Sequence, residues 1–167
     1  MQKRRRIFIA INLPPEIKKE LAQYGKKFPD LPARWTPEDN LHITLEFLGE
    51  MYDHELPEAV ERAKEMAAGL KVFEIHLNRI EYAPAGKIPF NVAQGKPPRM
   101  LWATGENVHV TLARISAFAW RQIEPEERPE VNESIDMPFT VESIEVMESE
   151  LKKGGPVYTI IESFPLK

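Results

Sequence analysis

The chain has no cysteine at all and only four histidines among its 167 residues. Without cysteine it cannot build a disulfide framework, a thiolate zinc site or a cysteine nucleophile. The absence is typical of a reducing compartment, so we expect a cytoplasmic protein. A metal site would have to be made from histidine and carboxylate side chains alone.

Long apolar runs are missing as well. No stretch approaches the roughly 20 residues that a membrane-spanning helix requires, so we expect no membrane association. The N-terminal segment 1–6, which contains four basic residues, and the apolar run IFIAINL together resemble a signal peptide. However, the run is short, contains Asn12 and is followed by Pro14 and Pro15 without a small-residue cleavage site. We interpret this run as the first strand. The length and the 43% hydrophobic content predict a single domain over residues 1–167.

An excess of positive charge is also absent. The net charge of -4 argues against a protein that coats long nucleic acids by bulk attraction. Basic clusters occur at residues 3–6, at Lys96 with Arg99, and at residues 152–153. Each cluster alone is most typical of a solvated surface. Taken together with the motif described next, they favour a small or end-bound anionic ligand.

A short motif occurs twice in the chain, each time with a histidine two residues before a threonine. The first copy has His42 and Thr44 within LHITLEFLGE, and the second has His109 and Thr111 within VHVTLARI. Residues two apart on a β-strand share a face and lie about 6.5 to 7 Å apart. If the two strands are neighbours in one sheet, two imidazoles and two hydroxyls converge on a phosphate-sized spot. The pattern therefore favours phosphodiester cleavage without a metal.

The rest of the chain predicts alternating strands and helices, typical of an α/β or α+β sheet protein. Proline in the first turn marks the start of both expected helices. Pro29 and Pro32 end the first, and Gly69 lies near the end of the second. The expected elements are a strand over 7–13, a helix from Pro14 toward Phe28, an arm over 34–37, a strand over 40–49 closed by Gly49, a helix over 56–70, a strand over 72–83, a Pro/Gly-rich loop over 84–98, a strand over 99–104, the second motif strand, an irregular segment over 116–138, and strands over 139–151 and 157–166 joined by a hairpin turn.

Several segments together resemble the 2H phosphoesterase superfamily, and most closely its RNA 2',3'-cyclic phosphodiesterase branch, historically called 2'-5' RNA ligases. They are IFIAINLP, ARWTPEDNLHITLEFLGE, RMLWA, VHVTLARI and FTVESIEVMESEL with GGPVYTIIESFPL. The resemblance covers nearly the whole chain in the family's order. It implies an α+β fold of two pseudo-symmetric lobes, each an antiparallel sheet with outer helices, and a central groove lined by the two motifs.

The resemblance also implies a role for each motif residue. His42 would be the proton donor to the 3'-oxygen leaving group, and His109 would be the proton acceptor that activates water. Thr44 and Thr111 would bind the phosphate oxygens. The family often has a basic residue at the position of Arg114, which helps to bind the substrate phosphate. The substrates would be RNA ends or small nucleotides with a cyclic phosphate, opened to 2'-phosphomonoesters with no metal, no cofactor and no obligatory protein partner.

General chemistry supports these roles independently. Opening a cyclic phosphodiester in line needs a base for the attacking water and an acid for the departing oxygen, and imidazole suits both near neutrality. The two histidines must hold opposite protonation states, which predicts a bell-shaped pH profile whose pKa values belong to the pair. Threonine hydroxyls would supply preorganised donors where negative charge develops.

Other interpretations stay open at this stage. The same site would catalyse the reverse reaction, 2'-5' joining of RNA halves, and a non-catalytic module could hold a nucleotide or RNA end without turnover. A lone strand histidine is usually structural, and we interpret His54 and His76 in that way. Trp35, Trp102 and Tyr158 could stack a nucleobase, although packing is the more common role of aromatic side chains.

Two features depart from the family pattern. Strict alternation places Arg114 on the face away from His109, so either the strand bulges or ends by Ala113 or Arg114 is not a phosphate ligand. Only residues 105–108 connect the strand at RMLWA with the second motif, where the family has a helix-bearing connector. We expect a tight turn there and a second lobe that lacks this helix. The short connector is a natural minimal form, an engineered deletion or a stretch missing from the sequence, and if the residues are truly absent one sheet face is left uncovered.

Overall fold

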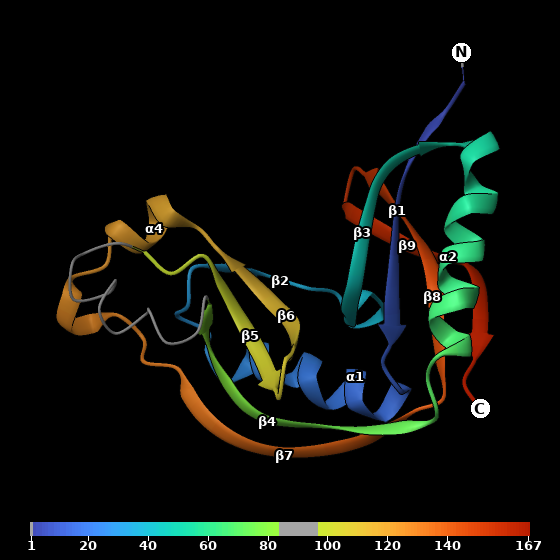
Figure 1. Ribbon diagram of the computed structural model, residues 1–167. Helices are drawn as coiled ribbons and strands as arrows, with labels where there is room; N and C mark the ends of the chain where they lie inside the picture. Colours follow the sequence, from blue (N-terminus) through green and yellow to red (C-terminus); the bar gives the residue numbers. More distant parts are fainter. Residues whose placement is uncertain (1, 84–96) are drawn as a thin grey trace. The chain divides into compact units, whose positions relative to one another are not determined.

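The computed structural model describes residues 2–83 and 97–167 (Figure 1). The chain divides into two compact units, of which the first comprises Met1–Leu13, His42–Ile75 and Phe139–Lys167 and the second Pro14–Leu41 and His76–Pro138. Most of the loop expected over 84–98, together with Lys96, lies outside the described residues. In the part that is described, no helix has the length and apolar character needed to cross a membrane.

The first unit contains a four-stranded antiparallel sheet in the order β3-β1-β8-β9. The strands are β1 (Arg4–Asn12), β3 (His42–Tyr52), β8 (Ser143–Lys152) and β9 (Gly155–Pro165). The strand predicted over 7–13 is confirmed as β1, which begins three residues earlier. Its residues from Ile7 to Ile11 are all buried, so both faces of this central strand are covered. The hairpin turn between β8 and β9 is also confirmed, with Lys152 paired to Gly155.

Helix α2 (Leu56–Ala68) packs on β8 and β9 of this sheet (Figure 1). A 3-10 turn, η3 (Asp53–Glu55), leads into it, and proline occupies its first turn as predicted. Its buried residues are Ala59, Ala63 and Ala67, which are spaced four apart and so form one stripe. Their small side chains allow close packing on the sheet.

The second unit contains most of a five-stranded sheet in the order β2-β6-β5-β4-β7, of which the first residues of β4 and the last of β7 belong to the first unit. The strands are β2 (Ala33–Trp35), β4 (Phe73–Ala83), β5 (Met100–Gly105), β6 (Val108–Ile115) and β7 (Asn132–Val141). The same part of the chain forms α1 (Pro15–Ala22), η1 (Gln23–Lys26), η2 (Glu38–Asn40), α4 (Ala117–Arg121) and η4 (Pro125–Glu127). The helix expected from Pro14 toward Phe28 is thus α1 continued by a 3-10 turn.

The tight turn between β5 and β6 is confirmed. Glu106 and Asn107 connect the two strands, and Asn107 has a φ of 58°, as hairpin turns require. No helix stands between these strands. The exposed sheet face expected from this loss is not observed, because the inward side chains of both strands are at most 2% exposed. They are Leu101, Ala103, Val110 and Leu112.

Other expectations are wrong in detail. The single strand expected over 139–151 is two strands, β7 and β8, separated at Glu142, and β7 begins inside the segment expected to be irregular. β7 is an edge strand of its sheet, a position in which a proline such as Pro138 is tolerated. Gly49 does not close its strand, because it lies at a register shift of β3 with a φ of 86° and the strand continues to Tyr52.

The two motif strands are not neighbours in one sheet. β3 lies in the four-stranded sheet and β6 in the five-stranded sheet. The arrangement that the resemblance implies, one antiparallel sheet for each motif, is the one observed.

Candidate active site

The first motif lies on β3, and its two side chains contact each other. His42 Nε2 and Thr44 Oγ1 are 2.9 Å apart and share a hydrogen bond, which confirms that both point to one face of the strand. In the register with β1, His42 is opposite Asn12 and Thr44 is opposite Ala10. Both motif side chains are partly exposed, so this face offers an imidazole and a hydroxyl to a ligand.

Two aromatic rings hold the His42 imidazole. The Phe8 ring centroid lies 5.1 Å away in a tilted arrangement, and the Tyr158 ring lies 5.1 Å away, nearly perpendicular. Phe8 is itself fixed because it packs on Ala10 and Met147 in the core of the sheet. Edge contacts of this kind orient a ring. Tyr158 thus has the packing role that the sequence favoured, and the ring it packs on is the motif histidine.

A buried carboxylate, which the sequence analysis did not single out, lies on the same face. Glu145 is 5% exposed and is opposite Ala10 on β8. It accepts hydrogen bonds from the hydroxyls of Ser143 and Ser163, at 2.6 and 3.2 Å, and from the backbone N–H of Asn12 at 3.3 Å. These bonds compensate the burial of the charge and fix the end of β1 next to His42. The only signal in the sequence was one acidic residue within the apolar run IEVM.

The second motif lies on β6 in the other unit. His109 is opposite Thr104 and Thr111 is opposite Trp102, so the imidazole and the hydroxyl again share a face, as predicted. The Trp102 indole stacks on the His109 ring, with centroids 3.8 Å apart and planes inclined by 15°. An open pocket of about 270 Å³ adjoins this stack. It is lined by Glu81, Trp102, Thr104, Gly105, Asn107, Val108 and His109.

Partial burial lowers the pKa of His109, because the charged imidazolium loses solvation beside the indole. At neutral pH the ring is therefore mainly neutral. A neutral imidazole can accept a proton, as the predicted general base must.

Replacing Trp102 by alanine is expected to raise the pKa of His109 toward the ordinary histidine value, because the ring then regains solvent. If His109 is the base, activity appears as pH rises through this pKa, so the acid limb of the kcat/KM profile should shift to higher pH. NMR titration of the His109 ring proton and the pH profile provide the two measurements. Trp102→Phe keeps a stacked ring and should shift both less. An unchanged or lower His109 pKa in Trp102→Ala would contradict this account.

Arg114 reaches the motif face through a β-bulge. β6 has an extra residue relative to β5 between Thr111 and Ala113. Arg114 therefore pairs with Met100, which shares a face of β5 with Trp102, the partner of Thr111. Of the two alternatives left by the sequence, the bulge is confirmed. The Arg114 side chain is exposed, and its Nη1 lies 3.8 Å from the Met100 sulfur.

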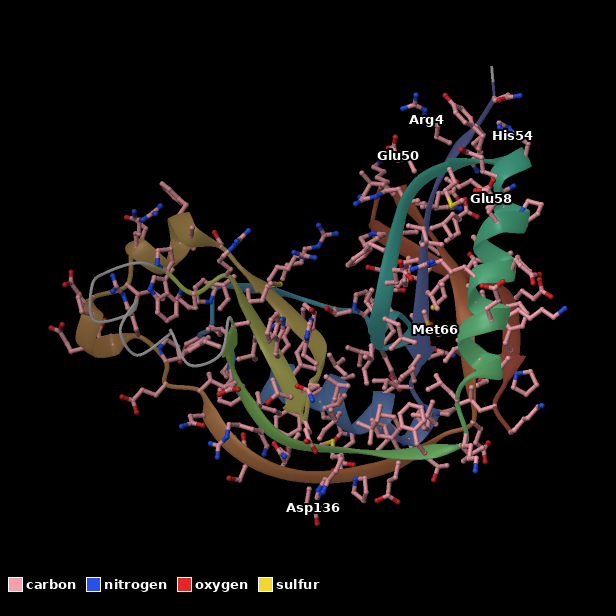
Figure 2. All side chains as sticks on the ribbon, in the orientation of Figure 1. Arg4, Glu50, His54, Glu58, Met66 and Asp136 are labelled. Atoms are coloured by element: carbon pink, nitrogen blue, oxygen red, sulfur yellow. The ribbon has the colours of Figure 1, made fainter. Side chains whose placement is uncertain are left out.

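The N-terminal basic cluster has a structural role at most of its positions. Arg4 pairs with Glu50 at 3.3 Å, near the outer ends of β1 and β3 (Figure 2). The other pairs join Lys3 to Glu150 at 3.5 Å, and Arg5 to Asp53 and Glu148 at 2.8 and 3.2 Å. Lys152 also lies 3.9 Å from Glu150. These basic side chains thus form ion pairs with carboxylates of the same chain.

The two remaining histidines behave as their sequence contexts indicated. His54 stacks on Tyr52 with ring centroids 5.7 Å apart, and His76 Nε2 is 2.5 Å from Asp136 Oδ1 at the surface. Trp35 is partly buried and packs over Gly25.

Comparison with known proteins gives consistent results. The family model described as LigT-like phosphoesterase matches residues 11–93, which include the first motif. A Thermus thermophilus protein named RNA 2',3'-cyclic phosphodiesterase is 30% identical over 187 residues, which cover 97% of this chain and 90% of that protein. This alignment is longer than the chain, so the relative carries residues that this chain lacks.

Solved structures show the same fold. The crystal structure of TT0787 from Thermus thermophilus has a TM-score of 0.76 and 26% identity, and the match covers 96% of this chain and 97% of that one. Escherichia coli LigT complexed with 3'-AMP has a TM-score of 0.72 and 20% identity over 98% of this chain and 99% of that one. The paired motifs, the two antiparallel sheets and this similarity along the whole chain lead to one conclusion: the chain belongs to the LigT-like phosphoesterase family.

Proposed function

We propose that the protein hydrolyses RNA ends that carry a 2',3'-cyclic phosphate to 2'-phosphomonoesters, without a metal ion. One observation carries the proposal: each of two sheets presents an imidazole and a hydroxyl on a single face, at the motifs that the sequence shares between its halves. The name of the Thermus relative supports the substrate class. The proposal treats residues 1–167 as one domain whose two units serve one reaction.

In the proposed reaction, His109 takes a proton from the attacking water. The water oxygen bonds to phosphorus, the bond from phosphorus to the 3'-oxygen breaks, and His42 gives its proton to that oxygen. The product keeps its phosphate on the 2'-oxygen. The two histidines then hold the opposite protonation states from those at the start, and exchange with solvent restores them.

The remaining motif residues bind the phosphate. Thr44 and Thr111 donate their hydroxyls to its non-bridging oxygens, where negative charge increases in the transition state. The hydrogen bond between Thr44 and His42 holds the first hydroxyl beside its imidazole. Arg114 adds a guanidinium one row from Thr111 on the face of the second motif, where it suits a phosphate group of the RNA substrate in geometry and charge.

The product identifies the reaction. With an oligonucleotide ending in 2',3'-cyclic phosphate, in the presence of a chelator, we expect a 2'-phosphate end, because the 3'-oxygen is the group that leaves. ³¹P NMR and resistance of the end to a 3'-specific phosphatase would establish its position. A 3'-phosphate product, or activity that the chelator abolishes, would contradict the proposed function. Binding without turnover would favour a non-catalytic module.

A further inference from the structure

Two arginines face each other across neighbouring strands of the five-stranded sheet. In the register between β2 and β6, Arg34 lies directly opposite Arg114. Both side chains are exposed. Directly opposed residues of antiparallel strands point to the same side, and like charges in such a pair repel each other. An anion held by both guanidinium groups would remove this repulsion.

The arginine pair, defined as Arg34 and Arg114, lies on the face of the second motif. Met100, Trp102 and Thr104 alternate along β5 and share one face, and their partners on β6 are Arg114, Thr111 and His109. That face thus has three successive rows: the arginine pair, then Thr111, then His109. Rows on one face are about 7 Å apart.

Among the residues that the structure describes, Arg114 forms no ion pair with a carboxylate. In the described residues, Arg4, Arg5 and Arg62 each form an ion pair with a carboxylate, whereas Arg114 Nη1 contacts the Met100 sulfur at 3.8 Å. A carboxylate on this face, Glu81, is opposite Trp102 and accepts a hydrogen bond from Thr104 at 3.4 Å. The guanidinium of Arg114 therefore adds a positive charge to this end of the face, in a chain of net charge -4.

We propose that the arginine pair is a second phosphate site, which binds the phosphodiester adjacent to the terminal cyclic phosphate. This inference rests on the proposed function, since the terminal group is taken to lie at Thr111 and His109. The next phosphate of the strand is one nucleotide away, a separation comparable to that between the Thr111 row and the arginine row. Guanidinium groups bind phosphate oxygens in bidentate geometry. The protein therefore acts preferentially on an RNA end with at least one further linkage, rather than on a mononucleotide.

The test compares two substrates in two variants. For a trinucleotide with a terminal 2',3'-cyclic phosphate, Arg34→Ala is expected to raise KM about 10-fold, the usual effect of one lost charge-assisted hydrogen bond, with kcat unchanged. For a mononucleotide 2',3'-cyclic phosphate neither constant should change. Arg121→Ala removes another exposed arginine of the same unit, from α4, and should affect neither substrate.

A substrate with one uncharged linkage tests the site on the wild-type protein, so the result does not depend on whether a variant folds. Replacing the linkage next to the cyclic phosphate by a methylphosphonate removes its charge, so the wild-type protein should show the same rise in KM and Arg34→Ala should add no further loss. Equal effects of Arg34→Ala on the mononucleotide and the trinucleotide would overturn the proposal. So would equal KM values of the wild type for the phosphodiester and the methylphosphonate.

A failure of the proposed function is distinguishable from a failure of this site. If the wild type hydrolyses neither substrate, the function fails, and fluorescence anisotropy with a trinucleotide 2'-phosphate still tests the arginine pair. We expect about 10-fold weaker binding of the methylphosphonate form. In Arg34→Ala the slope of the logarithm of the binding constant against the logarithm of the salt concentration should be smaller by about one. Identical binding of both forms would overturn the second phosphate site.

Discussion

Replacing His42 or His109 by alanine is expected to lower kcat for opening a 2',3'-cyclic phosphate by about 10²- to 10⁴-fold, the usual contribution of a positioned acid or base. Each substitution removes one proton transfer in the proposed reaction while the phosphate-binding hydroxyls remain. KM should change little, because neither imidazole is the principal phosphate ligand. Steady-state kinetics on a short cyclic-phosphate oligonucleotide would measure both constants.

The other two histidines offer matched controls. His54 stacks on Tyr52 and His76 contacts Asp136, and neither belongs to an H-x-T motif. His54→Ala and His76→Ala should therefore retain wild-type kcat. Wild-type kcat in either motif variant, or a loss of similar size in the two control variants, would contradict the assigned roles.

A substrate whose leaving group needs no proton is expected to rescue His42→Ala but not His109→Ala. p-Nitrophenolate leaves as an anion near neutral pH, so a nucleoside 2'-phosphate p-nitrophenyl ester does not require a general acid. On this ester His42→Ala should approach wild-type kcat, whereas His109→Ala should still lose about 10²- to 10⁴-fold, because water needs a base with either substrate. Release of p-nitrophenolate, followed by absorbance, measures the rates.

This comparison separates the roles of the two histidines. Rescue of His109→Ala with no rescue of His42→Ala would mean that the acid and the base are exchanged. Equal losses for both variants on both substrates would mean that neither histidine is the acid for the leaving group. Thr44→Ser is a suitable control, since it retains the hydroxyl and should behave as wild type on both substrates.

Periodic segments were the most predictable part of the fold. The alternation in β1, β4 and β5 and the helical spacing in α2 follow from one or two buried faces, which the apolar pattern records directly. The H-x-T spacing likewise determines that each histidine and threonine share a face, since strand geometry permits no other result over two residues.

Irregular features were not predictable, because they depend on partners far away in sequence. β7 joins a sheet edge despite Pro138 and two acidic residues, so its own pattern resembled an irregular segment. The bulge that returns Arg114 to the face of Thr111 arises from the register with β5, which a single strand does not encode.

Side chains that support the motifs were also difficult to predict. Trp102 and Tyr158 were considered as aromatic residues that stack a base or pack in the core, but their contacts with the two motif histidines come from neighbouring strands. Glu145 gave almost no signal, because a charged residue in an apolar strand is satisfied only by hydroxyls that lie two and eighteen residues away. The predicted acid, base and phosphate ligands themselves stay predictions.

The central claim is that the two motif histidines act in one reaction, and the double variant His42→Ala/His109→Ala tests it most directly. Residues that act in one chemical step are strongly non-additive. We therefore predict that the double variant, in single-turnover hydrolysis of a cyclic-phosphate oligonucleotide, loses little more activity than the more damaged single variant. Losses that multiply across the two substitutions would contradict the claim, since they would mean that the two histidines act independently.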